Sequence, residues 1–197
     1  MLNIDPVPLE LIDDPVLKQL LDQVREVQTP DLLFVQIMAH VPRSANAVFD
    51  ALYRSHVLGA VDHKLKEIIR IQLARLAEDT YFANLRSAKA KQAGLTEEMI
   101  EAGCGDFDNE PGFSAAEKWA LRYAYLMFRE RQRVDKAFYD EGKTLYSEAD
   151  IMELGAFIAF HYGLQVFMRT LHAFPAHDRD GNPISQEESA ALYGTTV

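Results

Sequence analysis

Apolar residues recur at helical spacing along almost the whole chain, and no segment alternates apolar and polar residues with a period of two. This pattern predicts an all-α fold. With 48% hydrophobic residues among 197, the chain can bury a sizeable core as one domain. The expected helices cover residues 15–28, 31–40, 43–58, a near-continuous stretch over 66–96, 96–102, 114–132, about 134–146 and about 147–173.

Several of these helices begin or end at residues typical of caps. Asp62 is expected to cap the long helix that begins HKLKEII, and Thr96 the segment TEEMIEA. Ser114 with Glu117 three residues later forms a capping box for the helix that follows. Gly94 predicts a left-handed end to the long helical stretch.

The charge balance limits the partners that the chain can have. The net charge is −10, and no tract is rich in Lys and Arg, which argues against nucleic acid or an anionic membrane surface as a partner. The N-terminus MLNIDPVPLELIDD is acidic where a secretory signal would be basic and then apolar. No apolar run approaches the roughly 20 residues that span a bilayer. We therefore expect a cytoplasmic protein with no membrane partner.

Cys104 is the single cysteine, so the sequence holds neither an internal disulfide nor a Cys-x-x-Cys pair. It lies in a loop predicted at residues 103–112, whose acidic residues should raise the pKa of the thiol.

No two histidines have the i, i+4 spacing of a metal site, and there is no Gly-rich phosphate loop. DRDGNPIS lacks a complete series of calcium ligands and is expected to be a surface turn. No metal or cofactor is expected.

The last long helix, DIMELGAFIAFHYGLQVFMRTLHAF, is apolar nearly all round and should be buried. Its polar exceptions are His161, Gln165, Arg169 and His172, which share one face at spacings of 4, 4 and 3. Because an unpaired buried polar group costs about 1–3 kcal/mol, they need partners. Either they line a cavity in which His161 acts as acid or base, or they lie at a subunit interface or bond to backbone carbonyls. Three further histidines are expected to be structural: His40, His56 and His63.

A second polar group falls in the long middle helix. Asp79, Phe82 and Arg86 occur at i, i+3 and i+7 and are expected on one face. Asp79 and Arg86 would be about 10 Å apart along the axis, too far to pair directly. Glu67 lies 12 residues before Asp79, and a break near residues 78–80 would bring it into the same pocket. Arg86 suits a bidentate grip on a carboxylate, and the alternative is a surface arginine.

Four stretches together resemble the carboxymuconolactone decarboxylase / alkylhydroperoxidase D-like superfamily: AHVP at 39–42, LKEII at 65–69, Tyr81 and AGLTEEMI at 93–100. FSAAEKWALRYAYLMF and YSEADIMELGAFIAFHYGLQVF look like that family's second half. The resemblance implies the alkylhydroperoxidase D-like helical fold, assembled as a homotrimer or homohexamer. The chain would then divide into an N-terminal helical extension (1–30), the family domain (31–173) and a polar, loop-like tail (174–197).

The peroxidase branch of that family carries a Glu, then Cys-x-x-Cys, and a His four residues after the second Cys. The resemblance places the Glu on Glu67, the cysteines on Asp79 and Phe82, and the His on Arg86. Without paired thiols the chain lacks the disulfide that thiol-dependent peroxide reduction requires. The decarboxylase branch has a Tyr, an acid and a His in this helix. Tyr81 matches, whereas Phe82 and Arg86 replace the acid and the His.

The resemblance and the residues together suggest a cofactor-independent lyase or isomerase that acts on a small organic acid. Arg86 would hold the carboxylate, Glu67 or His161 would move a proton, and Tyr81 would donate to a developing enolate. The remaining pocket residues would be Asp79, Phe82 and Gln165. One alternative is a non-catalytic oligomeric scaffold or ligand-binding protein, and another is a residual peroxidase that uses Cys104.

Overall fold

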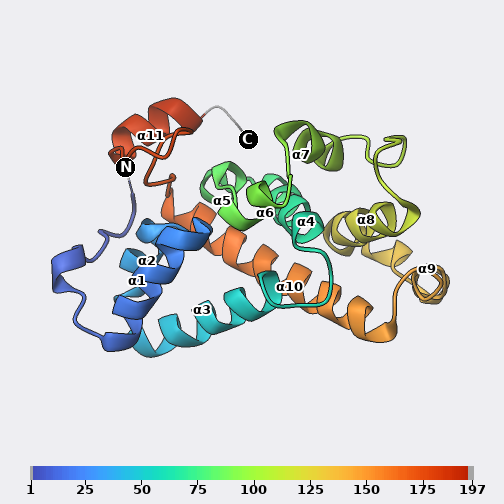
Figure 1. Ribbon diagram of the computed structural model, residues 1–197, viewed down its shortest axis with the longest axis horizontal. Coiled ribbons are helices and arrows are strands. Elements are labelled where there is room, and N and C mark those ends of the chain that lie inside the picture. The colour runs from blue at the N-terminus through green and yellow to red at the C-terminus, as the bar shows by residue number, and fades with distance from the viewer. Residues whose placement is uncertain (1, 195–197) are drawn as a thin grey trace.

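The computed structural model describes residues 2–194, and the regular elements of this part of the chain are all helices, which confirms the predicted all-α class (Figure 1). It contains no strand, only an isolated bridge between His177 and Pro183. The helices are η1 (Leu9–Leu11), α1 (Pro15–Val27), α2 (Leu32–Met38), α3 (Pro42–His56), α4 (His63–Leu76), α5 (Thr80–Asn84), α6 (Ala88–Gln92), α7 (Glu97–Cys104), α8 (Ala115–Arg129), η2 (Arg131–Arg133), α9 (Lys136–Gly142), α10 (Glu148–Leu171) and α11 (Gln186–Tyr193).

Two helices, α4 and α10, form the centre of the molecule and pack against each other. Figure 1 shows α10 running through the length of the fold, with α1, α2 and α3 at one end and α8 and α9 at the other. Around it are two buried apolar clusters. One joins α4 to α7, α8 and the first half of α10, and the other joins α1, α2, α3 and α5 to the end of α10. The boundary between these two clusters is where the candidate site lies.

The predicted caps are confirmed. Asp62 accepts a hydrogen bond from the Leu65 N–H, Thr96 caps α7, and Ser114 opens α8 with a full capping box. Gly94 adopts φ 89°, the left-handed conformation expected at the end of that region.

The near-continuous helix predicted over 66–96 is wrong, because the chain breaks twice. Helix α4 ends at Leu76, Glu78 adopts φ 55°, and Asp79 caps α5 by accepting from the Phe82 N–H. Helix α5 ends after five residues, and Ser87 then caps α6. The first break falls where a kink near 78–80 was predicted. Its consequence is that Asp79, Phe82 and Arg86 do not share a helical face.

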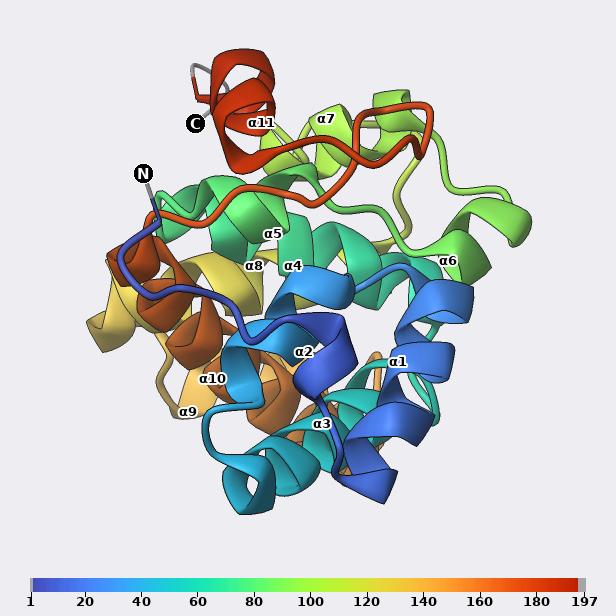
Figure 2. The same ribbon diagram turned by 90° about the vertical axis from the view of Figure 1, so that its left-hand side faces the viewer.

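The tail is not simply loop-like, because it contains α11. Ser185 and Glu188 form a capping box at the start of this helix, a Ser-x-x-Glu signal that is present in the sequence. The side chain of Asp31 accepts from the Ala176 N–H, which ties the start of the tail to the N-terminus of α2. Figure 2 shows the tail and α11 lying over the end of the bundle that contains α5.

The N-terminal extension packs into the same core as the region that follows it. Leu17, Leu21 and Val24 of α1 are buried in one cluster with residues of α2, α3 and α5. The boundaries of the three predicted segments stay predictions.

By length and composition α10 could cross a bilayer, contrary to the expectation that no segment is apolar enough. The helix is continuous, but its apolar sequence includes the polar residues Glu153, His161, Gln165 and Arg169. Of its most apolar window, 39% is buried inside the protein. A central helix packed on several others is typical of a core helix. A cytoplasmic location remains a prediction.

Candidate active site

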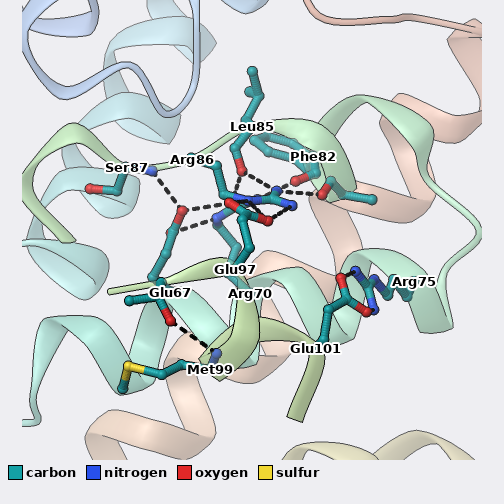
Figure 3. A network of polar contacts seen from close by, with 12 residues as sticks. Glu67, Arg70, Arg75, Phe82, Leu85, Arg86, Ser87, Glu97, Met99 and Glu101 are labelled. Atoms are coloured by element: carbon teal, nitrogen blue, oxygen red, sulfur yellow. Dashed lines mark hydrogen bonds and ion pairs between the residues drawn. The ribbon is translucent and has the colours of Figure 1, made fainter. Parts of the chain in front are cut away.

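Glu67 lies on α4 with its side chain fully buried, and two neighbours, Arg70 and Ser87, hold its carboxylate by hydrogen bonds (Figure 3). Arg70 donates to both oxygens at 2.8 Å, and the Ser87 N–H donates to Oε1 at 2.7 Å. His56 Nε2 lies 3.0 Å from Oε2, at a poor angle for a hydrogen bond. Burial alone would raise the pKa of Glu67, but the charge and hydrogen bonds of Arg70 hold it well below its usual value. Glu67 is therefore ionised and paired.

Arg70 organises the loop as well as the carboxylate. Its Nη1 donates to the Phe82 carbonyl at 2.6 Å, and Nη2 donates to the Leu85 carbonyl at 2.8 Å. These carbonyls belong to the short α5 and the residue after it, so the guanidinium replaces helix bonds that the break removed. A guanidinium has five N–H donors, and four are used among the described residues. One Nη1 hydrogen remains.

Two histidines from different helices meet beside this pair. The rings of His56 (α3) and His161 (α10) lie 5.5 Å apart between centroids, and both side chains are buried. Phe157 packs on His161 at 4.2 Å. Burial lowers the pKa of His56 to about 4 and holds that of His161 well below its usual value, so both rings are neutral at neutral pH. His161 Nε2 has no hydrogen-bond partner within the described part of the chain.

A third histidine connects this group to α6. His63 Nδ1 lies 2.8 Å from the His56 carbonyl, and because a carbonyl only accepts, Nδ1 carries the proton in that contact. The other ring nitrogen lies 2.9 Å from Ser87 Oγ and, in a neutral ring, accepts from that hydroxyl. The rings of His56 and His63 are 4.5 Å apart. Ser87, His63, His56 and Glu67 thus form a closed polar group.

A cavity between α1, α3 and α10 adjoins these side chains. His56, His161, Arg70 and Phe82 are among the buried residues of its wall. The half-buried residues of the wall are Gln23, Val27, Tyr53 and Val57. About 30 Å³ is open to the centre of a water molecule, which is room for one or two waters. A larger ligand enters only if the half-buried side chains move.

Of the residues singled out in the sequence, the structure brings four together. Glu67, His161 and Phe82 meet at or beside the cavity, and Gln165 donates from Nε2 to the Arg70 carbonyl at 2.8 Å. The Gln165 Oε1 atom is buried without a partner in the described chain. Of the polar residues predicted on one face of α10, only His161 and Gln165 therefore lie at the candidate site. Arg169 and His172 are exposed, and His172 ends the helix in a left-handed conformation.

Arg86 lies elsewhere. Its guanidinium donates to both oxygens of Glu97 and to the Leu85 carbonyl (Figure 3). It also donates to the Ala83 carbonyl. It lines a different, polar hollow of about 820 Å³ beneath the tail. It does not reach the cavity that contains His161, so the structure does not bring it into one pocket with the predicted proton-transfer residues.

Tyr81 and Asp79 are buried and each makes a hydrogen bond, while Asp79 Oδ1 has no partner in the described chain. The Tyr81 hydroxyl donates to Asp31 at 2.5 Å, and burial followed by the Asp31 charge raises its pKa well above the usual value. Asp79 caps α5, and burial raises its pKa to about 7. Neither lines the cavity. Their positions favour structural roles at the break.

Cys104 is the last residue of α7, not part of a loop. Burial raises the pKa of its thiol to about 11, so the increase predicted from acidic neighbours has desolvation as its main cause. It lines a hollow next to Gln72 and Arg75. The described residues contain no cluster of three or more His, Cys, Asp or Glu side chains that could hold a metal ion.

Sequence reasoning missed two residues of this centre, Arg70 and His56. Arg70 follows Glu67 by three residues in KEIIR, the spacing of a helical ion pair, and this signal was available. His56 lies beside Glu67 only because of how α3 crosses α4, and no local sequence pattern encodes that crossing.

The structure thus defines an all-α protein whose candidate site combines a buried Glu–Arg ion pair with two neutral histidines. The fold is the alkylhydroperoxidase D-like one, as the solved structures show. A peroxidase-related protein from Ralstonia eutropha, described as an alkylhydroperoxidase AhpD core, superposes with a TM-score of 0.73 at 13% identity over 93% of both chains. One from Silicibacter superposes with a TM-score of 0.70 at 14% identity, covering 90% of this chain and 95% of that one.

The debrominase Bmp8 has the same fold. A cysteine-to-alanine variant of it, solved in complex with 2,3,4-tribromopyrrole, superposes with a TM-score of 0.70 at 19% identity over 96% of this chain and 97% of that one. The sequence matches no family model and no curated protein. Likeness at these identities establishes the fold, which the resemblance had predicted, and leaves the reaction to be argued from the site.

Proposed function

We propose that this protein is a cofactor-independent enzyme, a lyase or isomerase, that moves a proton on a small organic acid in the cavity between α1, α3 and α10. The observation that carries the proposal is the unpartnered, buried Nε2 of His161 beside His56. A buried polar atom without a partner costs about 1–3 kcal/mol, and a substrate that supplies a proton would remove this cost.

The three charged or basic groups have complementary roles. A neutral imidazole accepts a proton from a C–H acid, and His161 is suited to do so because its Nε2 has no partner among the described residues, whereas His56 Nε2 faces Glu67. The ionised Glu67, which lies beside His56, stabilises any imidazolium that forms in this pair of histidines. The spare Nη1 hydrogen of Arg70 would stabilise the carboxylate or the enolate oxygen, the role that the sequence had suggested for Arg86 and Tyr81.

The cavity limits the size and the polarity of the substrate. Most of its wall is apolar, including Val24, Phe49, Leu52 and Phe82. A small, flat or ring-shaped body with a single acidic group would fit once Tyr53 moves aside. Bmp8, which shares the fold, binds a tribrominated pyrrole, and this supports a small ring as the ligand class.

Hydrogen–deuterium exchange tests the proposal. In D₂O, phenylpyruvate and related small 2-oxo acids should lose C–H signals next to the carbonyl in proton NMR spectra when the protein is present. His161→Asn should slow this exchange by about 10²-fold or more, the usual contribution of a general base. His172→Asn, on the same helix but exposed, is the matched control. Equal exchange in wild type and His161→Asn would contradict the assignment.

A non-catalytic scaffold or ligand-binding protein is the second candidate, and one observation favours it. The Glu67 carboxylate is already saturated by Arg70 and Ser87, as expected of a structural ion pair. This reading predicts that the protein catalyses no exchange with any of these acids, while Glu67→Gln lowers stability. Finding exchange that depends on His161 would exclude it.

A further inference from the structure

A second hollow lies between α4, α7, the following loop, α8 and η2. About 280 Å³ is open there, near the lower end of small-molecule sites. Three arginines from different elements contribute to its wall: Arg75 (α4), Arg122 (α8) and Arg133 (η2). Among the described residues, Asp108 is the only acidic member of this wall. Three guanidinium groups thus converge on this hollow in a chain whose net charge is −10.

Each of these arginines has a carboxylate partner but keeps unused donors. Arg75 pairs with Glu101, Arg122 with Asp108 and Glu141, and Arg133 with Glu130. The partner carboxylates are exposed, between 38% and 61%, and ion pairs of this kind contribute only about 0–1 kcal/mol. Each guanidinium has five N–H donors, and no more than two per residue are used in these pairs. A ligand anion can therefore bind without displacing a strong interaction.

A buried amide in the same wall lacks a partner. Gln72 is 3% exposed, and its Nε2 donates to the Gly103 carbonyl at 3.3 Å, which fixes the orientation of the amide. Its Oε1 has no partner in the described chain. An acceptor left unpaired in this way costs about 1–3 kcal/mol, and a hydroxyl or amine donor in the hollow would recover it. The rest of the wall is apolar, with Leu76, Phe107, Tyr125 and Leu126.

We propose that this hollow is a binding site for a small carboxylate with an apolar or aromatic body and one hydroxyl or amine donor. The carboxylate pairs with Arg122 and Arg133, the body packs on Tyr125 and Leu126, and the donor bonds to Gln72 Oε1. The site is separate from the cavity of the proposed reaction, with which it shares no wall residue.

The single cysteine supplies the readout, because Cys104 is part of this wall. The rate at which N-ethylmaleimide alkylates Cys104 is measured by mass spectrometry, at about pH 8.5 since the thiol reacts as its thiolate. The probes are 4-hydroxybenzoate, benzoate and inorganic phosphate. We expect 4-hydroxybenzoate to slow alkylation in a saturable way, benzoate to do so at higher concentration, and phosphate to have little effect.

Variants locate the binding site. Arg122→Gln should raise the half-protecting concentration of 4-hydroxybenzoate by about tenfold, the value of one charge-assisted contact. Arg133 is more exposed, and Arg133→Gln repeats this test in a variant less prone to misfold. Arg54→Gln, which also removes a surface arginine from an ion pair, is the matched control and should leave protection unchanged. Gln72→Met should remove the preference for 4-hydroxybenzoate over benzoate.

Three outcomes would overturn the proposal. They are the absence of saturable protection by 4-hydroxybenzoate, protection that survives in both arginine variants, and protection by phosphate equal to that by 4-hydroxybenzoate. His161→Asn should not change protection. The result for this hollow therefore stands apart from the result for the proposed reaction.

Discussion

At the scale of single residues, the pair of Glu67 and Arg70 dominates the energetics of the centre. Both side chains are fully buried, and each depends on the other for charge compensation. Removing one partner of a buried pair leaves an uncompensated charge, whereas removing both leaves none. The local stability therefore depends on the pair as a unit.

Arg70→Met is expected to lower the free energy of unfolding by about 3–5 kcal/mol because Glu67 is left as an unpaired buried charge. The double variant Glu67→Met/Arg70→Met should cost clearly less than the sum of the two single changes. Urea unfolding followed by circular dichroism measures both. Arg54→Met, which breaks an exposed pair with Asp50, is the control and should cost less than about 1 kcal/mol. Additive costs at the buried pair would contradict the interpretation.

The raised pKa of Asp79 predicts that the stability of the protein depends on pH. Its pKa rises from 3.8 to about 7 on folding because of burial, so the folded state binds this proton more tightly than the unfolded state. The contribution to stability is complete below about pH 3.8 and is lost as the pH rises through 7. Asp79→Asn keeps a cap for α5 without a charge, so it should stabilise the protein at pH 8 by up to about 4 kcal/mol.

The gain from Asp79→Asn should shrink toward zero as the pH is lowered to about 4. Unfolding by urea at several pH values measures this difference. Asp62→Asn replaces an equivalent capping aspartate at an exposed position and controls for the change of cap. A gain that is constant with pH would show that Asp79 is not a buried, titrating group.

At the scale of elements, close contacts decide which helices can pack. A Cβ built on Gly142 of α9 would lie 2.3 Å from the Trp119 ring of α8, so the two helices meet over a glycine. Trp119 also stacks on Phe138, and its indole N–H donates to the Phe138 carbonyl. This contact fixes α9 against α8.

Gly142→Ala should therefore destabilise the protein by about 1–3 kcal/mol, since the added methyl group must displace the indole. The Trp119 fluorescence spectrum should shift in the folded state, because this is the only tryptophan. Gly112→Ala, where the nearest atom is a flexible Glu110 oxygen at 3.4 Å, is the control and should change stability little. An unchanged tryptophan environment in Gly142→Ala would contradict the packing.

Local signals in the sequence were sufficient for most helix ends but not for the centre of the site. The caps at Asp62, Thr96 and Ser114 depend on neighbouring residues, and they were predicted correctly. The second break, after α5, depends on Arg70 binding carbonyls 12 and 15 residues away, which no short pattern contains. The capping box of α11 is a local Ser-x-x-Glu signal within an otherwise polar tail.

In the candidate site, too, residues marked by a local pattern were predicted and residues placed by distant contacts were not. His161 and Gln165 were found because helical spacing places them on one buried face. A helix continuous over residues 79–86 predicts Arg86 on one face with Asp79 and Phe82, whereas the end of α5 at Asn84 places Arg86 against Glu97. His56 could not be predicted since its role arises only where α3 crosses α4 and α10.

At the scale of the whole molecule, α10 presents an outer face without charge. Met152 and Phe167 are 59% and 42% exposed, and the small residues Ala156, Ala159 and Gly163 between them are also exposed. We propose that this face packs in a homo-oligomer, the trimer or hexamer that the resemblance implied. A charge placed in the middle of such a face would oppose association.

Light scattering on the purified protein should give a mass of three or six chains, and Ala159→Arg should give a monomer with unchanged helical content. Thr170→Arg, near the end of the same helix and exposed, is the control for adding a charge to α10. A wild-type protein that is monomeric at all concentrations would contradict the proposal that this face packs in a homo-oligomer.

The central claim is that His56 and His161 are enclosed, neutral bases beside an ionised Glu67. Histidine-selective ¹⁵N NMR over a pH series tests it most directly, with His56→Asn and His161→Asn used to assign the two rings. The account predicts that His56 remains neutral down to about pH 5 and that the pKa of His161 lies well below the ordinary histidine value. Protonation of either ring near pH 6.5 would contradict it.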